Sequence, residues 1–387
     1  MNMEKISVTH VIFLEEVPEY PPLGGAENHL LTLLPALVNV GVDVELIVLL
    51  RCLGPIIKNA FSRLSEAGVK LSILQVAKRR ARFSFGLNTL QRFVPLFHAL
   101  RTRNHRIIHL HLDFWSFPLA ARLAGCPKVV MTIHNDEQWF TRFPDRQWLQ
   151  WLDSGIVQYI AISERVKDYY RNAVGIDPLK IDRIYYGLNM DGPQTDKESV
   201  RIKCNIPVDR YVIGFVGRLV FQKNVELLIE AAGFFPEEHF VIVGEGVLRD
   251  KLHRMAKDMP NVQFLGYQSN GKELISSFDL FCLPSRFEGL GLVLVEAMQK
   301  RTPILASRAG AIPEILGYGK YGFLFESEDL NDLVSQLKSI LDNPQSVSDT
   351  VERAEEYARV VFDAKQMAVQ TTKVYAKVLN MPVKNLH

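Results

Sequence analysis

The sequence predicts an α/β protein with two doubly wound domains, each built on a parallel sheet. Short apolar runs alternate with longer amphipathic stretches along most of the 387 residues. Several runs are continuous in Val, Ile and Leu, which is typical of strands buried on both faces of a parallel sheet. One polar segment, 191–199, which includes Gly192 and Pro193, separates two such series. Because the chain is too long for one ordinary core, two series of βαβ units indicate two domains.

Each element is placed by its own pattern. Helices are expected over 26–39 and 164–173, where amphipathic stretches end at Gly41 and Gly175. Everything from residue 330 onward is expected to be helical. Strands are expected over 6–14, 44–50, 69–76, 106–112, 128–133 and 156–162, and then over 212–216, 239–243, 262–265, 280–283, 304–306 and 322–325. We expect an N-terminal domain over 1–190, a second domain over 191–365, and a C-terminal helix over 366–387 that could cross back to the first.

Composition narrows the class of protein. Hydrophobic residues make up 48% and charged residues 23%, which is usual for a globular protein, and the net charge of +2 gives no field that would attract nucleic acid. We expect no signal peptide, because Glu15 and Glu16 end a short apolar run, and no membrane span over 30–50, where Pro35 and two acidic residues intervene. A cytoplasmic protein is expected. The cysteines have no metal-ligand spacing and are interpreted as buried hydrophobes: Cys52, Cys126, Cys204 and Cys282.

Two loops that follow predicted strands carry glycines and charges, and ligands bind beyond the carboxyl ends of such strands. In the loop over 21–27, Gly24 and Gly25 precede a helix whose N-terminus would favour an anion; a plain turn is the alternative. In the loop over 215–224, Arg218 and Lys223 are five residues apart, beside Gly217. Two such cations can clamp a diphosphate from two sides. The alternative is a solvated basic loop.

A third loop, over 285–296, contains two carboxylates. Gly289 and Gly291 leave backbone N–H groups able to face phosphate or sugar oxygens at a helix start. Glu288 and Glu296 are eight residues apart, about two helical turns, so helical periodicity predicts that both point to the same side. Carboxylates accept hydrogen bonds from paired hydroxyls, as on a sugar ring or a ribose. A capping glutamate and an unrelated surface glutamate are the alternatives.

Glu288 and Glu296 resemble the glutamate–seven-residue–glutamate motif of retaining GT-B glycosyltransferases, particularly glycosyltransferase family 4 (glycosyl transferases group 1). The loops at Gly24–Glu27 and Arg218–Lys223, and the segments 243–246 and 306–314, follow in that family's order, so the resemblance spans about residues 6–325. It implies the GT-B fold, with two Rossmann-like domains facing across a cleft.

The resemblance also implies a role for each matching position. Arg218 and Lys223 would hold the donor diphosphate and stabilise its departing charge. Glu288 would bind the hydroxyls of the donor sugar, and Glu296 the ribose. His134, which ends the run Thr132-Ile133-His134, would lie near the anomeric carbon. The remaining donor-binding positions are Gly24, Gly25, Gly217, Glu245, Gly246, Gly289, Leu290, Gly291 and Leu292, and no metal ligand is implied.

The implied activity is that of a retaining hexosyltransferase. It would move a hexosyl unit from a nucleotide-diphosphate sugar to the hydroxyl of a sugar or lipid-linked acceptor, in surface glycan or glycolipid biosynthesis. A UDP-sugar is the favoured donor, with GDP-mannose as the alternative, and neither a cofactor nor a metal is expected. The bond would break through an oxocarbenium-like state, and the leaving diphosphate would deprotonate the acceptor.

The chain departs from the family pattern at three places. Asn224 stands where the family often has glycine, and Ala311 replaces a second glycine. The segment Tyr185-Tyr186-Gly187-Leu188-Asn189 takes the place of a typical Pro-Asn-Gly-Val-Asp hinge segment. None of these changes removes a charged group from the predicted site.

Two further features have open interpretations. His109, His111 and Asp113 alternate along one strand and so share a face, which suits a metal site, but we favour an acceptor-binding or structural role. The stretch 78–106 has eight Lys and Arg residues, no acidic residue and interleaved phenylalanines. It could lie on an anionic membrane surface, or form an ordinary helix with a solvated basic face. No motif supports nucleic-acid binding.

Three other classes of function remain as alternatives. A nucleotide-sugar epimerase of GT-B fold would act on the donor without an acceptor, and a non-catalytic protein would only bind nucleotide sugars. A nicotinamide dehydrogenase is disfavoured because no complete GxGxxG follows the first strand, and Gly244-Glu245-Gly246 is only a fragment of it.

Overall fold

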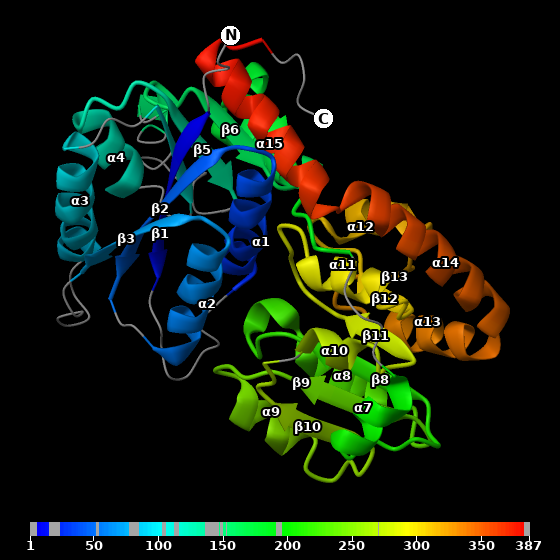
Figure 1. The fold of residues 1–387 in the computed structure, drawn as a ribbon. Coiled ribbons are helices and arrows are strands. Elements are labelled where there is room, and N and C mark those ends of the chain that lie inside the picture. The colour runs from blue at the N-terminus through cyan, green and yellow to red at the C-terminus, as the bar shows by residue number, and fades with distance from the viewer. Residues whose placement is uncertain are drawn as a thin grey trace. The chain divides into compact units, whose positions relative to one another are not determined.

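The computed structural model of the protein consists of two compact α/β units (Figure 1). It describes residues 6–14, 24–51, 54–76, 85–102, 106–111, 116–135, 147, 150–151, 153–190, 196–269 and 271–382. Among these, unit 1 comprises the residues up to Gly187 and those from Ala364 onward, and unit 2 comprises Leu188–Asp363. The corresponding boundaries expected from the sequence are 190/191 and 365/366.

Unit 1 is built on a seven-stranded parallel sheet with the strand order β3-β2-β1-β4-β5-β6-β7. Its strands are β1 (Ser7–Leu14), β2 (Asp43–Leu50), β3 (Lys70–Gln75), β4 (Ile107–His111), β5 (Val129–Ile133), β6 (Gln158–Ala161) and β7 (Ile181–Arg183). The order reverses between β1 and β4, which pair with His10 opposite His109. This is the switch point of the sheet, where ligands bind in doubly wound folds.

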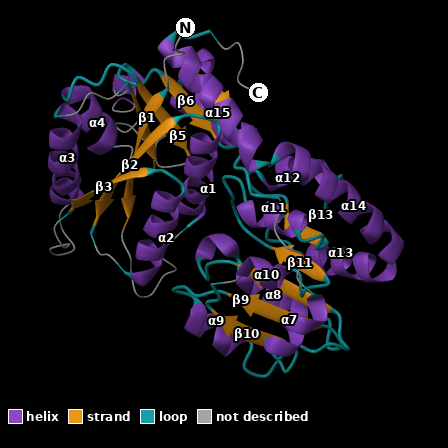
Figure 2. Ribbon diagram, viewed as in Figure 1, coloured by secondary structure: helices purple, strands orange, loops and turns teal. Residues whose placement is uncertain are grey.

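Helices cover both faces of this sheet, as right-handed crossovers require when the strand order reverses. In Figure 2, α3 and α4 lie on one side of the sheet and α1 and α2 on the other. The helices of unit 1 are α1 (Gly25–Asn39), α2 (Pro55–Glu66), α3 (Phe85–Arg101), α4 (Ser116–Leu123), α6 (Glu164–Tyr169) and α15 (Ala364–Leu379).

The hydrophobic core of unit 1 contains residues from α1, near the start of the chain, and from α15, near its end. Leu30, Leu33, Leu34 and Leu37 form the buried stripe of α1, at the spacing of one helical face. They share a hydrophobic cluster with residues of α15, including the fully buried Tyr375. Each buried leucine contributes about 1.5–3 kcal/mol relative to an exposed one, so this stripe fixes the start of α1 against the sheet.

Unit 2 repeats the plan with a six-stranded parallel sheet of order β10-β9-β8-β11-β12-β13, whose switch point lies between β8 and β11. Its strands are β8 (Val212–Val216), β9 (His239–Val243), β10 (Val262–Gly266), β11 (Leu280–Leu283), β12 (Ile304–Ser307) and β13 (Phe323–Phe325). Its helices are α7 (Lys197–Lys203), α8 (Val225–Ala232), α9 (Arg249–Met255), α10 (Gly271–Ile275), α11 (Leu292–Gln299), α12 (Ile312–Ile315), α13 (Leu330–Asp342) and α14 (Pro344–Val361).

The last helix of the chain belongs to unit 1. After α14 the chain pairs briefly with the segment that leaves β7, because Leu188 N–H donates to the Phe362 carbonyl at 2.7 Å. Helix α15 then packs against α1, and Lys128 Nζ, just before β5, donates to the Val378 carbonyl at 2.7 Å. The end of the chain thus contributes side chains to unit 1.

The predicted fold class is confirmed, and all twelve predicted strands are present, with bounds that agree or differ by one or two residues. One strand was missed: β7 is three residues long and includes Asp182 and Arg183, so it has no apolar run. The predicted helix over 164–173 ends at Tyr169 and continues as a π-helical turn to Val174. No helix in the described part of the chain is long and apolar enough to cross a membrane.

Candidate active site

The switch point of unit 2 brings together a lysine and a glutamate that are 65 residues apart in sequence. Lys223 ends the loop after β8, and Glu288 lies in the loop after β11. Lys223 Nζ donates to Glu288 Oε1 at 2.5 Å, and Ser285 Oγ donates to the same oxygen at 2.7 Å. Glu288 is only 6% exposed, so the carboxylate is held by a buried ion pair and a buried hydroxyl.

The second oxygen of Glu288 is less engaged. Among the contacts of the described residues, Oε2 has only the Gln222 side-chain amide, at 3.5 Å. Gln222 itself makes a shorter bond to the Phe287 carbonyl, at 2.9 Å. A carboxylate oxygen can accept two hydrogen bonds, so Oε2 retains capacity for a donor on a ligand.

The two loops are joined along their backbones as well as by their charges. Arg286 N–H donates to the Gln222 carbonyl at 2.8 Å, and Arg286 Nη1 donates to the Phe221 carbonyl at 2.7 Å. The Arg286 guanidinium also lies over the Phe221 ring at 4.1 Å from its centre. These bonds fix the distance between the lysine loop and the glutamate loop.

The loop after β9 completes the backbone framework of this site. Leu219 N–H donates to the Glu245 carbonyl at 2.9 Å. A Cβ atom at Gly246 would lie 2.4 Å from the Leu219 carbonyl oxygen, and one at Gly244 would lie 1.8 Å from the Gly217 oxygen. Glycine is therefore required at both positions, because the loop after β9 packs closely against the backbone of the loop after β8. The Glu245 side chain lies 3.6 Å from Arg249 in a weak ion pair.

Arg218 is the charged residue of the site whose side chain is exposed to solvent. Its side chain is exposed, and it makes no side-chain hydrogen bond or ion pair within the described residues. It precedes Leu219, whose backbone is fixed to Glu245, so the base of the arginine is held while its guanidinium faces solvent. An exposed guanidinium of this kind is able to bind an anionic ligand such as a phosphate.

Glu296 occupies a different environment from Glu288. It lies on α11, is largely buried, and pairs with Lys272 of α10 at 3.0 Å. Burial raises the pKa of Glu296, and the Lys272 charge acts in the opposite direction. Helical periodicity was the wrong reason to group the two glutamates, because Gly291 takes a left-handed conformation with φ 81° and α11 begins only at Leu292. Glu288 thus precedes the helix, and Gly289 and Leu290 connect the two.

In unit 1, His134 and His29 of α1 share one buried neighbour, Tyr186. His134 follows β5, and its Nδ1 is hydrogen-bonded to the Tyr186 hydroxyl. The ring of His29, on α1, stacks on Tyr186 with centres 3.8 Å apart. Gly24 lies at the start of the same helix, where an added Cβ would be 2.9 Å from Glu27 Oε2, whereas Gly25 faces open space.

Burial sets the charge state of His134. It is 5% exposed, and desolvation lowers the pKa of its imidazole to about 3, so the ring is neutral at physiological pH. Its Nε2 atom is buried and has no partner among the described residues. His134 can therefore donate or accept a hydrogen bond through Nε2.

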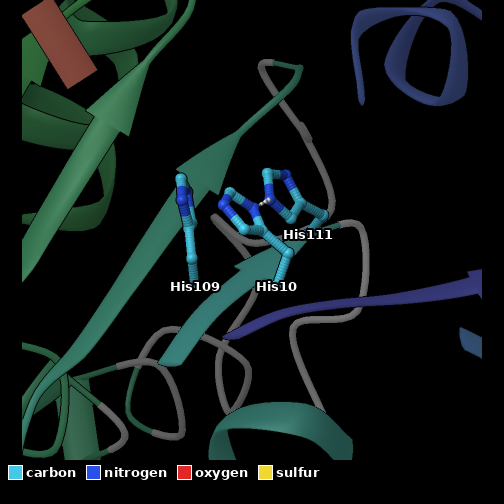
Figure 3. Close-up of side chains that lie close together, drawn as sticks. All are labelled: His10, His109 and His111. Atoms are coloured by element: carbon cyan, nitrogen blue, oxygen red, sulfur yellow. Dashed lines mark hydrogen bonds between the residues drawn. The ribbon is translucent and has the colours of Figure 1, made fainter. Parts of the chain in front are cut away.

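Next to His134 lies a second group of histidines, His10, His109 and His111, whose ring nitrogens come within 4.8 Å of one another (Figure 3). His10 Nδ1 and His111 Nε2 are 3.0 Å apart in nearly coplanar rings, and His10 Nε2 lies 3.3 Å from the Tyr375 hydroxyl. His109 is bonded to that hydroxyl and to Thr132 Oγ1, each at 2.7 Å. Both nitrogens of His10 and of His109 are thus used in hydrogen bonds, so a metal would have to displace them. Asp113, predicted to join this group, lies outside the described residues.

Sequence reasoning missed several residues of these sites. Ser285, Gln222 and Lys272 gave no signal because their contacts depend on how separate loops pair. His10 is opposite His109 only through strand register. Tyr186 was noted as a departure from the hinge pattern, but its contact with His134 was not predicted.

The two doubly wound parallel sheets, each with its own switch point, are the two Rossmann-like domains of the GT-B fold. Residues 196–360 match the family described as Glycosyl transferases group 1, and residues 23–191 match Glycosyltransferase Family 4. The chain belongs to this glycosyltransferase family.

Individual relatives agree with this assignment. The chain is 34% identical over 161 residues to the sulfoquinovosyl transferase SQD2 of Arabidopsis thaliana, a match that covers 40% of this chain and only 31% of that protein. It is 26% identical to an Escherichia coli UDP-Gal:alpha-D-GlcNAc-diphosphoundecaprenol alpha-1,3-galactosyltransferase, over 66% of this chain and 72% of the relative. The structure of Anabaena Alr3699/HepE in complex with UDP and glucose superposes with a TM-score of 0.79 at 19% identity, covering 96% of this chain and 100% of that one. At that identity the likeness shows the fold.

Proposed function

We propose that this glycosyltransferase moves a hexosyl unit, with retention of configuration, from a nucleotide-diphosphate sugar to an acceptor hydroxyl. A UDP-sugar is the favoured donor, and GDP-mannose is the alternative. The observation that carries the proposal is the buried Lys223–Glu288 pair beside the open Arg218, at the switch point of unit 2. The UDP and galactose named for the Escherichia coli relative, and the UDP bound by Alr3699/HepE, support this choice of donor.

Each side chain of unit 2 has a role that follows from its contacts. Glu288 Oε2 accepts hydrogen bonds from the sugar hydroxyls, because Oε1 is already used by Lys223 and Ser285. Arg218 and Lys223 hold the diphosphate and stabilise the charge that develops as it leaves. Glu296 accepts from the ribose hydroxyls, and the close-packed turn at Glu245 and Gly246 lies near the nucleoside. Gly217 and the residues from Gly289 to Leu292 allow the backbone to approach the ligand.

Arg218 and Lys223 also explain how the enzyme would work without a metal. A divalent cation stabilises the charge of a diphosphate, and these two cationic side chains can contribute the same kind of stabilisation, with the charge of Lys223 shared between the diphosphate and Glu288. We therefore propose that activity does not depend on added metal. From unit 1, His134 acts near the anomeric carbon, and Gly24 and Gly25, at the start of α1, meet the phosphate.

The experiment that tests the donor assignment is a thermal-shift screen with a panel of nucleotide sugars, followed by turnover with the donor that stabilises the protein. A matched donor at about 100 times its dissociation constant adds about 2.7 kcal/mol to the stability of the fold that binds it. Incubation with the donor alone, without an acceptor, distinguishes transfer from epimerisation. If no nucleotide sugar raises the Tm, the proposal is wrong.

Arg218→Ala tests the clamp itself. Loss of one group that stabilises a leaving charge lowers kcat by about 100- to 1000-fold. Arg254→Ala is the matched control, since Arg254 is an exposed arginine of α9, outside the three loops of the site. Unchanged turnover of Arg218→Ala with intact donor binding would contradict the assignment.

For the acceptor, we propose a lipid-linked or anionic glycan at a membrane surface, contacted by the basic stretch 78–106. The diphosphoundecaprenol acceptor in the name of the Escherichia coli relative supports this class. Within this stretch the structure describes α3, Thr102 and Arg106, while Lys78–Arg82 and Arg103 lie outside the described residues. Arg92 and Arg101 of α3 lie over phenylalanine rings at 4.9 Å and 5.9 Å. In a flotation assay, vesicles with anionic lipid should carry the protein and neutral vesicles should not. Equal recovery from both would remove the membrane surface from the proposal.

A further inference from the structure

Tyr186 connects the segment that follows β7 to His134. It follows β7 and is the second-last residue before the chain enters unit 2. Its side chain is 4% exposed, and its hydroxyl is hydrogen-bonded to His134 Nδ1 across 52 residues of sequence. It belongs to the segment Tyr185–Asn189, which departs from the hinge segment expected from the family resemblance.

The tyrosine ring is fixed by a second histidine. His29, from the first turns of α1, stacks on Tyr186 with ring centres 3.8 Å apart and planes at 15°. His29 and His134 are themselves 6.3 Å apart between centres. Because α1 is anchored by its buried leucine stripe, the stacked ring cannot rotate without disturbing the helix. The hydroxyl is therefore held at a defined point relative to β5 and α1.

Both groups in this hydrogen bond are uncharged. Burial, with the Glu27 carboxylate adding to it, raises the pKa of Tyr186 well above its usual range, so its hydroxyl keeps the proton. His134 is neutral for the reason given above. A neutral imidazole nitrogen is a better acceptor than a phenol oxygen, so the hydroxyl donates and Nδ1 accepts. The ring proton of His134 then resides on Nε2, the buried nitrogen that has no partner among the described residues.

We propose that Tyr186 is a positioning residue that fixes the orientation of His134 and its tautomer, with the ring proton on Nε2, and that the proposed role of His134 depends on this tautomer. The inference rests on the proposed place of His134 near the anomeric carbon. Tyr186 does not touch the substrate and acts through His134 alone. The same logic governs catalytic histidines whose second nitrogen is held by a neighbour.

Tyr186→Phe, with Tyr375→Phe as its matched control, tests the proposal. Tyr375 is a buried tyrosine of the same unit, and its hydroxyl also bonds to histidines, His109 and His10, which are outside the proposed machinery. Both variants remove one buried hydroxyl, so both should lower the Tm. Only Tyr186→Phe should lower kcat, by about 10- to 100-fold, with the KM for the donor unchanged within about twofold. An equal loss of kcat in both variants would show a general structural effect and overturn the proposal.

The background His134→Ala separates this inference from the proposed function. If Tyr186 acts through His134, adding Tyr186→Phe to His134→Ala causes no further loss of kcat. If His134→Ala loses activity while Tyr186→Phe on the wild-type background keeps it, the positioning role is wrong and the proposed function stands. If His134→Ala is fully active, the role of His134 is wrong and the inference falls with it.

A measurement on the unmutated protein covers the case in which Tyr186→Phe fails to fold. Nitrogen-15 NMR of imidazoles distinguishes the two neutral tautomers, and the His134 signal is identified by its loss in His134→Gln. We expect the Nε2–H form. A proton on Nδ1 would overturn the proposal, because Tyr186 would then be an acceptor and Nε2 could not donate.

Discussion

Replacing Lys223 by methionine tests the electrostatic design of the donor site. The two side chains of the Lys223–Glu288 pair are 12% and 7% exposed, with Nζ and Oε1 2.5 Å apart. Methionine keeps the length and apolar stem of lysine but removes its charge. Glu288 then stays buried with only Ser285 and Gln222 as partners.

The expected magnitude follows from this burial. Removing one partner of a buried ion pair costs about 3–5 kcal/mol, because the remaining charge has lost its compensation. For a domain of this size, about 3 kcal/mol corresponds to a Tm lower by about 6–12 °C. The double variant Lys223→Met with Glu288→Gln is expected to recover part of that loss, since a neutral amide can still accept from Ser285.

Calorimetry of the single and double variants gives the Tm values and, through a double-mutant cycle, the coupling between the two residues. Lys251→Met is the matched control, because Lys251 pairs with Glu226 in the same unit at 3.2 Å but is 54% exposed. Solvent screens the exposed Lys251 ammonium, so its loss is expected to cost less than the loss of the buried Lys223. Titration with UDP should show an affinity about 10- to 100-fold lower for Lys223→Met, the loss of one charge-assisted hydrogen bond. If Lys223→Met matches Lys251→Met in both stability and UDP affinity, the site is not organised by this pair.

Three further outcomes are expected. Turnover should be unchanged by EDTA, because Arg218 and Lys223 are proposed to stabilise the charge of the diphosphate; a loss that Mg²⁺ or Mn²⁺ restores would contradict this. Unit 1 should lose stability as the pH falls below 6.5 toward 3, because the pKa values of His10 and His134 are lowered to about 3 by burial and only the unfolded chain is protonated in that window. The loss is about 1.4 kcal/mol per pH unit for each histidine, and a urea midpoint that stays constant from about pH 6.5 to pH 5 would argue against it. Tryptophan fluorescence reports on this unit, since the four tryptophans are Trp115, Trp139, Trp148 and Trp151. In Lys272→Met, the pKa of Glu296 should rise further, because the neighbouring positive charge is lost. As the pH is lowered, the affinity for UDP should therefore begin to decline at a higher pH than in the wild type. An unshifted profile would exclude Glu296 from the binding of UDP.

The fold could be predicted from the sequence because most strands carry their own signal. A strand such as β9 is a continuous apolar run between polar segments, and its predicted and observed bounds agree. Strand β7 lacks that signal, since it is short and charged and is formed by pairing with β6. Its existence depends on tertiary contacts that no local pattern contains.

The candidate site could be predicted only as a set of separate loops. Glycines and charges after strands indicated Arg218, Lys223 and Glu288, but not that Lys223 and Ser285 both bind one oxygen of Glu288. Helical periodicity failed at Glu288 because a glycine with positive φ delays the start of α11. The histidine contacts required strand register and the return of α15 to unit 1, which are properties of the assembled sheet.

The charge states of the two units match the separation of charge that the proposed reaction requires. As the glycosidic bond to the diphosphate breaks, negative charge grows on the leaving group and positive charge on the anomeric carbon. The cations of the site, Arg218 and Lys223, belong to unit 2, where the diphosphate is proposed to bind. His134 is kept neutral by burial, with its pKa at about 3, so at its proposed place near the anomeric carbon it would add no positive charge. An imidazole at its ordinary pKa would become cationic in mildly acidic conditions and oppose that step. The burial of His134 beside Tyr186 would therefore serve the proposed chemistry as well as the fold, because it leaves the ring able to donate a hydrogen bond while it carries no charge.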